Sequence, residues 1–187
     1  MIFDESSALI LIDIQRGFDE PYWGPRNNAE MEVSVARLLA AWRRAGLTVV
    51  HVRHDSVEAK SPLRPGQSGN DFKSETQPLD GERIESKNVN SAFIGTGLED
   101  FLRRSKIDTL VLCGLTSDHC VSTTTRMAAN LGFKAYLPAD CLATFDRVGY
   151  DGRLWSAEDI HSSSLASLNG EFATVLGSAE IIETLMK

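Results

Sequence analysis

Short apolar runs alternate along this chain with longer segments in which apolar residues recur near helical spacing. The first run, ALILI at residues 8–12, is continuous and rich in branched side chains, which is typical of a strand buried on both faces of a sheet. A weaker strand is expected at residues 81–86. Four further runs resemble the first, at residues 47–52, 109–113, 133–137 and 172–176. The pattern therefore predicts a sheet of buried strands.

The segments between these runs predict helices. Residues 30–46 carry apolar side chains near helical spacing and end in Gly46, a C-terminal stop signal. Residues 96–105 open with Thr96 and Glu99, which we interpret as a capping box. Further helices are expected at residues 121–131, 156–170 and 178–187, the last two opening with a serine followed by an acid. Strands that alternate with helices predict an α/β fold with parallel strands, right-handed crossovers and helices on both faces.

Two stretches break this alternation. Residues 54–80 carry three prolines and almost no apolar periodicity, and a loop of that length in a compact domain is usually a functional flap or a flexible insertion. Residues 141–155 form a second irregular stretch.

Composition and charge narrow the possible functions. The length of 187 residues predicts one domain, residues 1–187. The formal net charge of -7 argues against binding to nucleic acid or to an acidic membrane surface. No apolar run approaches the roughly 20 residues of a membrane helix. The N-terminal stretch MIFDESSALILID carries acids where a secretory signal carries positive charge, so we expect a cytoplasmic protein.

The three cysteines, Cys113, Cys120 and Cys141, are too few and odd in number for a disulfide scaffold. No CxxC pair or HExxH helix accompanies them, so a zinc site is not expected. Cys113 lies inside a strand run and is interpreted as a small buried residue. Packing is also the preferred interpretation of Cys141.

Three reactive side chains follow predicted strands. Asp13 comes directly after the first run, Lys87 after the third strand, and Cys120 after the fourth. Ligands of open α/β sheets bind outside the carboxyl ends of the strands, so these side chains are expected to meet at one edge. Taken singly, each has an ordinary interpretation: a turn residue, a solvated lysine and a packed thiol.

Together the three residues predict nucleophilic catalysis. A thiol attacks as its thiolate, whose formation is favoured at a helix N-terminus or beside a cation such as Lys87, so we expect Cys120 to have a lowered pKa. Asp13 can accept the thiol proton and return it to a leaving amine. The loop GLTSDHC can present backbone N–H groups to a developing oxyanion.

Three motifs carry a resemblance to a known family: LIDIQRGF (11–18), SKNVNSAFIGTGLEDFL (86–102) and VLCGLTSDHCVSTTTRMAANLGF (111–133). In this order and spacing they resemble the isochorismatase-like cysteine hydrolase superfamily. The resemblance implies a three-layer α/β/α Rossmann-like fold with a six-stranded parallel sheet and a catalytic triad of Asp13, Lys87 and Cys120. It also implies a cis peptide between Leu115 and Thr116, with the Thr116 and Cys120 amides forming the oxyanion hole.

The chain departs from family members that hydrolyse nicotinamide, which carry a metal-binding Asp-x-His after the second strand. The matching stretch here is HVRHDS, and Arg53 stands where the metal-binding His would be. We therefore expect no metal and no other cofactor. Enzymes that act on isochorismate lack the nucleophilic cysteine, so Cys120 argues against that activity.

Several residues at the predicted active edge are candidates for binding substrate. Arg53 could pair with a substrate carboxylate or with Asp55, and His119 neighbours the nucleophile. Aromatic side chains in or beside the loops could form an apolar pocket that excludes water; these are Phe18, Trp23, Phe72 and Phe93. For these aromatic residues, packing within the loops is the alternative.

These observations predict a metal-independent cysteine amidohydrolase that cleaves a C–N bond of a small amide, ureido or lactam-type substrate through a thioester. The alternatives are a non-catalytic small-molecule binder, a nicotinamidase-type hydrolase with an atypical metal site, and a thiol redox protein. The last is disfavoured because no resolving cysteine lies close to Cys120 in sequence. We also expect a homo-oligomer, a dimer or tetramer, whose contacts include the 54–80 loop and the helix of residues 156–170.

Overall fold

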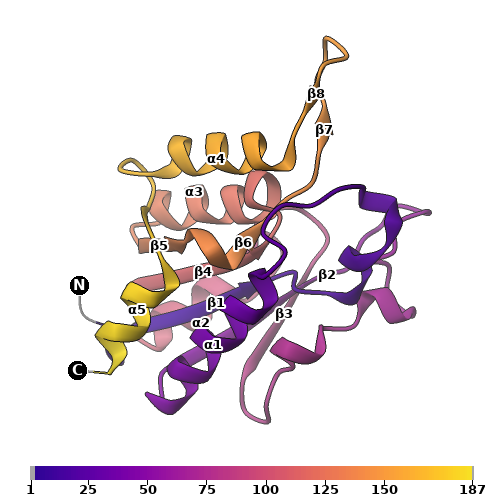
Figure 1. Cartoon of the computed structure of the whole chain (residues 1–187). Helices are drawn as coiled ribbons and strands as arrows, with labels where there is room; N and C mark the ends of the chain where they lie inside the picture. The colour runs from indigo at the N-terminus through magenta and orange to yellow at the C-terminus, as the bar shows by residue number, and fades with distance from the viewer. Residues whose placement is uncertain (1–2, 187) are drawn as a thin grey trace.

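A parallel sheet forms the centre of the computed structural model, which describes residues 3–186 (Figure 1). Its strands follow the order β3-β2-β1-β4-β5-β9, and the short strand β6 pairs with the end of β4. The strand bounds are β1 Ser7–Ile12, β2 Thr48–His54, β3 Arg83–Lys87, β4 Thr109–Leu115, β5 Lys134–Pro138, β6 Leu142–Ala143 and β9 Thr174–Leu176. Each of the six expected strands is present and parallel to its neighbours, which confirms the predicted sheet.

Helices cover both faces of this sheet. With right-handed crossovers, the strand order places α1 and α5 on one face and α2, α3 and α4 on the other (Figure 1). The helix bounds are α1 Met31–Arg44, α2 Leu98–Arg104, α3 Ser122–Asn130, α4 Ala157–Leu168 and α5 Ser178–Leu185. The central strands β1 and β4 are buried along their whole length because helices lie above and below them. The three-layer α/β/α fold is therefore confirmed.

The helix ends follow the sequence signals in part. Gly46 adopts a left-handed φ of 69° just beyond α1, which is the conformation a C-terminal glycine stop requires. Ser156 caps α4 by accepting a hydrogen bond from the Asp159 N–H at 3.1 Å. The expected capping box at Thr96 and Glu99 was wrong. The helix α2 begins after Gly97, and the Thr96 hydroxyl instead donates to the Ala92 carbonyl at 2.6 Å.

The 54–80 loop folds back on its own chain. Leu63 and Phe72 are 3% and 8% exposed, whereas Val57 and Leu79 are 77% and 56% exposed. Of these four apolar residues, only Val57 and Leu79 are exposed enough to contribute to the oligomer contact expected of this loop. Two short helical turns lie in this loop, η3 Ser68–Asn70 and η4 Ser74–Thr76. Other loops contain η1 Arg16–Asp19, η2 Pro21–Trp23, η6 Ala139–Cys141 and a π-helical turn η5 Ser117–Val121.

A β-hairpin replaces part of the second irregular stretch. Its strands, β7 Arg147–Val148 and β8 Leu154–Trp155, pair antiparallel and stand away from the body of the molecule above α4 (Figure 1). The apolar pattern of the sequence did not predict this hairpin. Among residues 3–186, no helix combines the length and the apolar character needed to cross a membrane.

One glycine sets the geometry where β1 and β4 end. Gly114 pairs with Ile12 and has a φ of 123°. A Cβ at this position would lie 1.9 Å from the Ile12 carbonyl oxygen, so only glycine allows this approach of the two strands. Asp13 and Thr116, which follow these strands, are thereby brought to the same edge of the sheet.

Candidate active site

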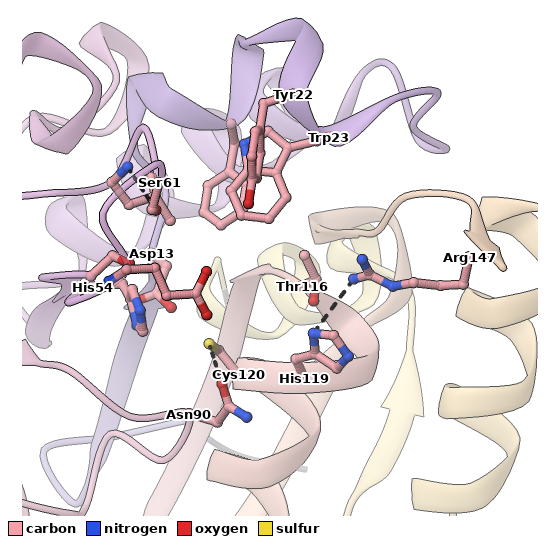
Figure 2. A pocket seen from close by; sticks show the side chains of 14 residues that line it. Asp13, Tyr22, Trp23, His54, Ser61, Asn90, Thr116, His119, Cys120 and Arg147 are labelled. Carbon is pink, nitrogen blue, oxygen red and sulfur yellow. Dashed lines mark hydrogen bonds between the residues drawn. The ribbon is translucent and has the colours of Figure 1, made fainter. Parts of the chain in front are cut away.

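A cavity of about 240 Å³ opens at the carboxyl ends of the central strands (Figure 2). Six of the sequence-predicted site residues line it: Asp13, Phe18, Trp23, Thr116, His119 and Cys120. The sequence pattern did not single out the remaining wall residues: Tyr22, His54, Ser56, Glu58, Ser61, Leu63, Asn90 and Arg147. Figure 2 shows the Cys120 sulfur directed towards the Asp13 carboxylate.

Asp13 is held rigidly where β1 ends. Its backbone turns into the left-handed region with a φ of 53°, and its N–H donates to the Val52 carbonyl at 2.9 Å. The residue is fully buried. Oδ2 accepts a hydrogen bond from Lys87 Nζ at 2.6 Å, whereas Oδ1 has no partner among the described residues. Asp13 thus keeps one free acceptor oxygen in the buried site, as a general base needs.

Lys87 ends β3, and its side chain is fully buried. Its ammonium lies 2.6 Å from Asp13 Oδ2 and 3.3 Å from Cys120 Sγ. Burial disfavours the charged amine, but Asp13 and Cys120 outweigh this effect and raise the pKa of Lys87. The lysine is therefore a permanent cation between the carboxylate and the sulfur.

Cys120 lies in the π-helical turn that leads into α3 and is 8% exposed. Besides Lys87, its sulfur contacts Asn90 Oδ1 at 3.6 Å. Burial and the Asp13 carboxylate raise the pKa of the Cys120 thiol, and Lys87 opposes them without reversing the shift.

The expectation of a lowered Cys120 pKa is therefore corrected. Asp13 already balances the Lys87 charge, so a thiolate would leave a net negative charge in a buried site. The geometry therefore favours a thiol rather than a thiolate at Cys120.

The cis peptide between Leu115 and Thr116 is present, which confirms that prediction. Thr116 lines the cavity at the end of β4, in the same turn of chain as Cys120. The assignment of their two amides as an oxyanion hole stays a prediction.

Aromatic side chains form the upper wall of the cavity (Figure 2). The Phe18 and Trp23 ring centroids are 4.8 Å apart, and Phe145 stacks against both rings. Trp23 is fixed because its Nε1–H donates to the Gly17 carbonyl at 2.8 Å. Tyr22, 55% exposed, packs edge-on against Trp23 at the mouth.

Three residues expected to bind substrate do not line the cavity. Phe72 is buried edge-on to the His51 ring, and Phe93 stacks on Phe133 instead. Arg53 pairs with Asp55 at 3.2 Å and donates to the Ser86 hydroxyl. The second interpretation of Arg53, a pairing with Asp55, is thus the one that the structure supports.

The opposite wall carries His119 and Arg147. The Arg147 guanidinium approaches His119 Nδ1 at 3.5 Å and donates to Asp118 Oδ2 at 3.2 Å (Figure 2). Arg147 comes from the hairpin strand β7, which the sequence pattern did not reveal, so no signal placed it here. Asn90 lies within the quoted motif SKNVNSAF, three residues after Lys87, and this proximity was a usable signal.

One cluster of donor atoms in residues 3–186 has the compactness of a metal site: Asp13, His54 and Cys120 offer ligand atoms within 4.8 Å of one another. These three side chains all contact the Lys87 ammonium, at 2.6, 3.1 and 3.3 Å. A metal held by these three side chains would therefore lie close to the buried Lys87 cation, which would repel it. His51, the other histidine of β2, is turned into the protein and contacts Glu82 at 2.8 Å. This donor set does not fit a metal ion.

A buried thiol beside a cation and a carboxylate, at the carboxyl edge of a parallel sheet, is an arrangement suited to nucleophilic catalysis. Residues 7–180 match the Isochorismatase domain family, and the chain belongs to that family. It is a hydrolase, as its motifs predicted.

Similar proteins cover the whole chain. The chain is 44% identical over 184 residues to the isochorismatase family protein YrdC of Bacillus subtilis, covering 98% of each sequence. A crystal structure of a hydrolase of the family from Chromobacterium violaceum superposes with a TM-score of 0.95 at 47% identity, covering 100% of this chain and 97% of the other.

Some relatives have names that state a hydrolytic reaction. A streptothricin hydrolase of Streptomyces noursei is 31% identical over 141 residues, 74% of this chain and 50% of the relative. An N-carbamoylsarcosine amidase of Arthrobacter is 44% identical over 71 residues, 38% of this chain and 26% of the relative.

Proposed function

We propose that this hydrolase is a metal-independent cysteine amidohydrolase that cleaves a C–N bond of a small amide, ureido or lactam-type substrate. The observation that carries the proposal is the Lys87 ammonium, which bridges Asp13 and Cys120 at 2.6 and 3.3 Å beside the cavity. The names of the streptothricin hydrolase and the N-carbamoylsarcosine amidase support a reaction of this class. The cavity of about 240 Å³ suits a small substrate.

In the acylation step, Cys120 Sγ attacks the substrate carbonyl carbon while Asp13 takes the thiol proton. The oxygen of the tetrahedral intermediate lies at the Thr116 and Cys120 amides, which serve as the oxyanion hole. Asp13 returns its proton to the leaving nitrogen, the C–N bond breaks, and ammonia or an amine departs. The product of this step is a thioester on Cys120.

In the second half, water attacks the thioester carbonyl and Asp13 takes one water proton. Collapse of the tetrahedral intermediate breaks the C–S bond, the sulfur recovers the proton from Asp13, and the carboxylic acid leaves. Lys87 keeps its proton throughout and offsets whichever of Asp13 and Cys120 is anionic. Atoms and charges balance with water as the sole co-substrate.

An ammonia-release assay across small amides, ureides and lactams tests this function, with amine detection for substituted substrates. Turnover that disappears in Cys120→Ser supports the proposal. Absence of turnover across the panel, together with sluggish alkylation of Cys120, would favour the non-catalytic binder instead.

The assembly and location of the enzyme are part of the proposal. We propose one catalytic domain over residues 1–187, acting in the cytoplasm, where its three unpaired cysteines stay reduced. We propose a homo-oligomer in which the β7–β8 hairpin is a contact, because an isolated two-stranded ribbon is marginal in water. In this hairpin Val148 and Leu154 are 72% and 63% exposed, and Tyr150 is fully exposed.

Light scattering at micromolar concentration tests the oligomer. A mass of two or four chains is expected, and exchanging Val148 and Leu154 for Ser should lower it. A monomer mass for the unaltered protein would contradict the oligomer. An unchanged mass in the variant would mean that the contact lies outside the hairpin.

A further inference from the structure

The Lys87 ammonium has a third neighbour that the triad does not account for. His54 Nδ1 lies 3.1 Å from Lys87 Nζ. The two residues are directly paired in the register of β2 and β3, so their side chains leave the sheet on the same side. His54 also lines the cavity (Figure 2).

The hydrogen bonds of the Lys87 ammonium determine the tautomer of His54. A lysine ammonium has three N–H donors and no acceptor. Its side chain is fully buried, so each donor needs a protein partner. Asp13 Oδ2 and Cys120 Sγ take two of them, and His54 Nδ1 is the third partner. Nδ1 must therefore present its lone pair, which leaves the ring proton on Nε2.

We propose that His54 is a positioning residue of the active site: its neutral Nδ1 accepts the third Lys87 hydrogen and so directs the other two at Asp13 and Cys120. Without this acceptor the ammonium is free to rotate about its terminal bond. Its hydrogen bond to the sulfur then weakens, and the thiolate that forms during attack is less well stabilised. The catalytic part of this inference depends on the proposed function; the hydrogen-bond assignment does not.

The backbone of His54 is held by buried polar side chains, which limits where the ring can lie. Gln15 Oε1 accepts the His54 N–H at 2.8 Å, and Gln15 Nε2 donates to the His54 carbonyl at 3.1 Å. Asn70 Nδ2 donates to the same carbonyl at 3.1 Å. Neither Gln15 nor Asn70 lines the cavity. Their burial is consistent with a role in holding His54 against Lys87.

The charges around the ring agree with this assignment. Burial and the Lys87 charge lower the pKa of His54, against the opposing effect of nearby acids. The titratable and charged groups facing it are Asp13, Asp55, Glu58, Lys87 and Cys120. Because a protonated ring would place a second cation and a donor against the ammonium, His54 stays neutral at neutral pH.

NMR of protein with ¹⁵N-labelled histidine tests the assignment without any substrate. The chain has four histidines, and the signals missing from His54→Asn identify those of His54. At pH 7 we expect a neutral ring with an unprotonated Nδ1 and a proton on Nε2. A proton on Nδ1, in either the other tautomer or the imidazolium, would overturn the proposal. This measurement uses the unaltered protein, so it holds even if a variant folds poorly.

Alkylation of Cys120 by iodoacetamide tests the consequence, since Cys113 and Cys141 are fully buried. His54→Leu keeps the bulk without an acceptor and should slow alkylation at pH 7.5 by at least about tenfold, the usual effect of losing a hydrogen bond to a charged group. His54→Asn places an amide oxygen near the Nδ1 position and should restore most of the rate. Arg104→Gln, at an 81% exposed side chain on α2, is the control and should react like the unaltered protein.

Two outcomes would overturn the positioning role. One is a His54→Leu variant that reacts as fast as the unaltered protein. The other is a His54→Asn variant as slow as His54→Leu while the Arg104→Gln control is normal. Neither readout needs turnover, so a failed amide panel would count against the proposed function and leave this inference standing on its own measurements.

Discussion

Lys87 Nζ lies 2.6 Å from Asp13 Oδ2, and both side chains are fully buried. An ion pair removed from water in this way contributes little to stability unless its geometry is good and its remaining donors are satisfied. Here the ammonium also contacts Cys120 and His54. The pair therefore holds a carboxylate and a cation beside the Cys120 sulfur, next to the cavity.

Replacing Asp13 by Asn should separate two effects of the carboxylate: its proposed proton transfer during turnover and its raising of the Cys120 pKa. Turnover should fall by at least about 100-fold, the lower end for losing a general acid–base group. The pKa of Cys120 should fall, because the carboxylate that raises it is gone while Lys87 remains. Alkylation measured against pH should thus show its inflection at a lower pH than in the unaltered protein.

Asp100→Asn is the matched control, since this carboxylate is 78% exposed on α2. It should change neither turnover nor the alkylation profile. Full turnover in Asp13→Asn would remove Asp13 from the mechanism.

Replacing Lys87 by Met should shift the pKa of Cys120 in the opposite direction, upwards. The cation that lowers the pKa of Cys120 is lost, so the alkylation inflection should move to higher pH and turnover should fall. Asp13 is left as a buried unpaired charge, which typically destabilises a protein by about 3–5 kcal/mol.

The double variant Asp13→Asn, Lys87→Met should therefore melt at a higher temperature than Lys87→Met alone. Calorimetry checks this order, with the exposed Lys60→Met as the control. A double variant that melts below both single variants would contradict the buried pairing.

Activity should survive exhaustive chelation and dialysis, because the Lys87 ammonium contacts the three side chains that would hold a metal. Elemental analysis of the dialysed enzyme beside an ammonia assay checks this. Stoichiometric zinc, iron or manganese that is lost together with activity, and restores it when added back, would overturn the metal-free mechanism.

The sequence was sufficient to predict the sheet, the helix order and the proximity of Asp13, Lys87 and Cys120. Asp13 and Cys120 follow apolar runs and Lys87 follows the weaker strand expected at residues 81–86, and parallel strands bring their carboxyl ends to one edge. The order of the elements and the position of each residue relative to its strand are enough to predict that these side chains meet.

His54 was missed for a physical reason. The predicted strand ended at residue 52, whereas β2 continues to His54 and pairs it with Lys87. Successive residues of a strand point to opposite faces, so Arg53 turns away and His54 faces the site. Apolar runs cannot mark a strand end that consists of polar residues. Arg147 reaches the cavity from a hairpin whose place in the fold depends on tertiary packing.

Acid stability should depend on Glu32, far from the catalytic groups in sequence. Glu32 accepts two hydrogen bonds from Arg26, at 2.7 and 2.9 Å, and another from Lys73. Burial favours the neutral acid, but these cations outweigh it and lower the pKa of Glu32 to about 2. A lowered folded-state pKa stabilises the protein fully above the unfolded value, near 4.5, and this stability is lost as the pH falls towards 2.

Glu32→Gln should consequently lower the melting temperature at pH 7 and show a smaller loss of stability between pH 4.5 and 2 than the unaltered protein. Thermal melts across that range measure both effects, with the exposed Glu171→Gln as the control. Equal slopes in Glu32→Gln and the unaltered protein would mean that Glu32 titrates alike in the folded and unfolded chains. In that case its contacts with Arg26 and Lys73 would contribute nothing to acid stability.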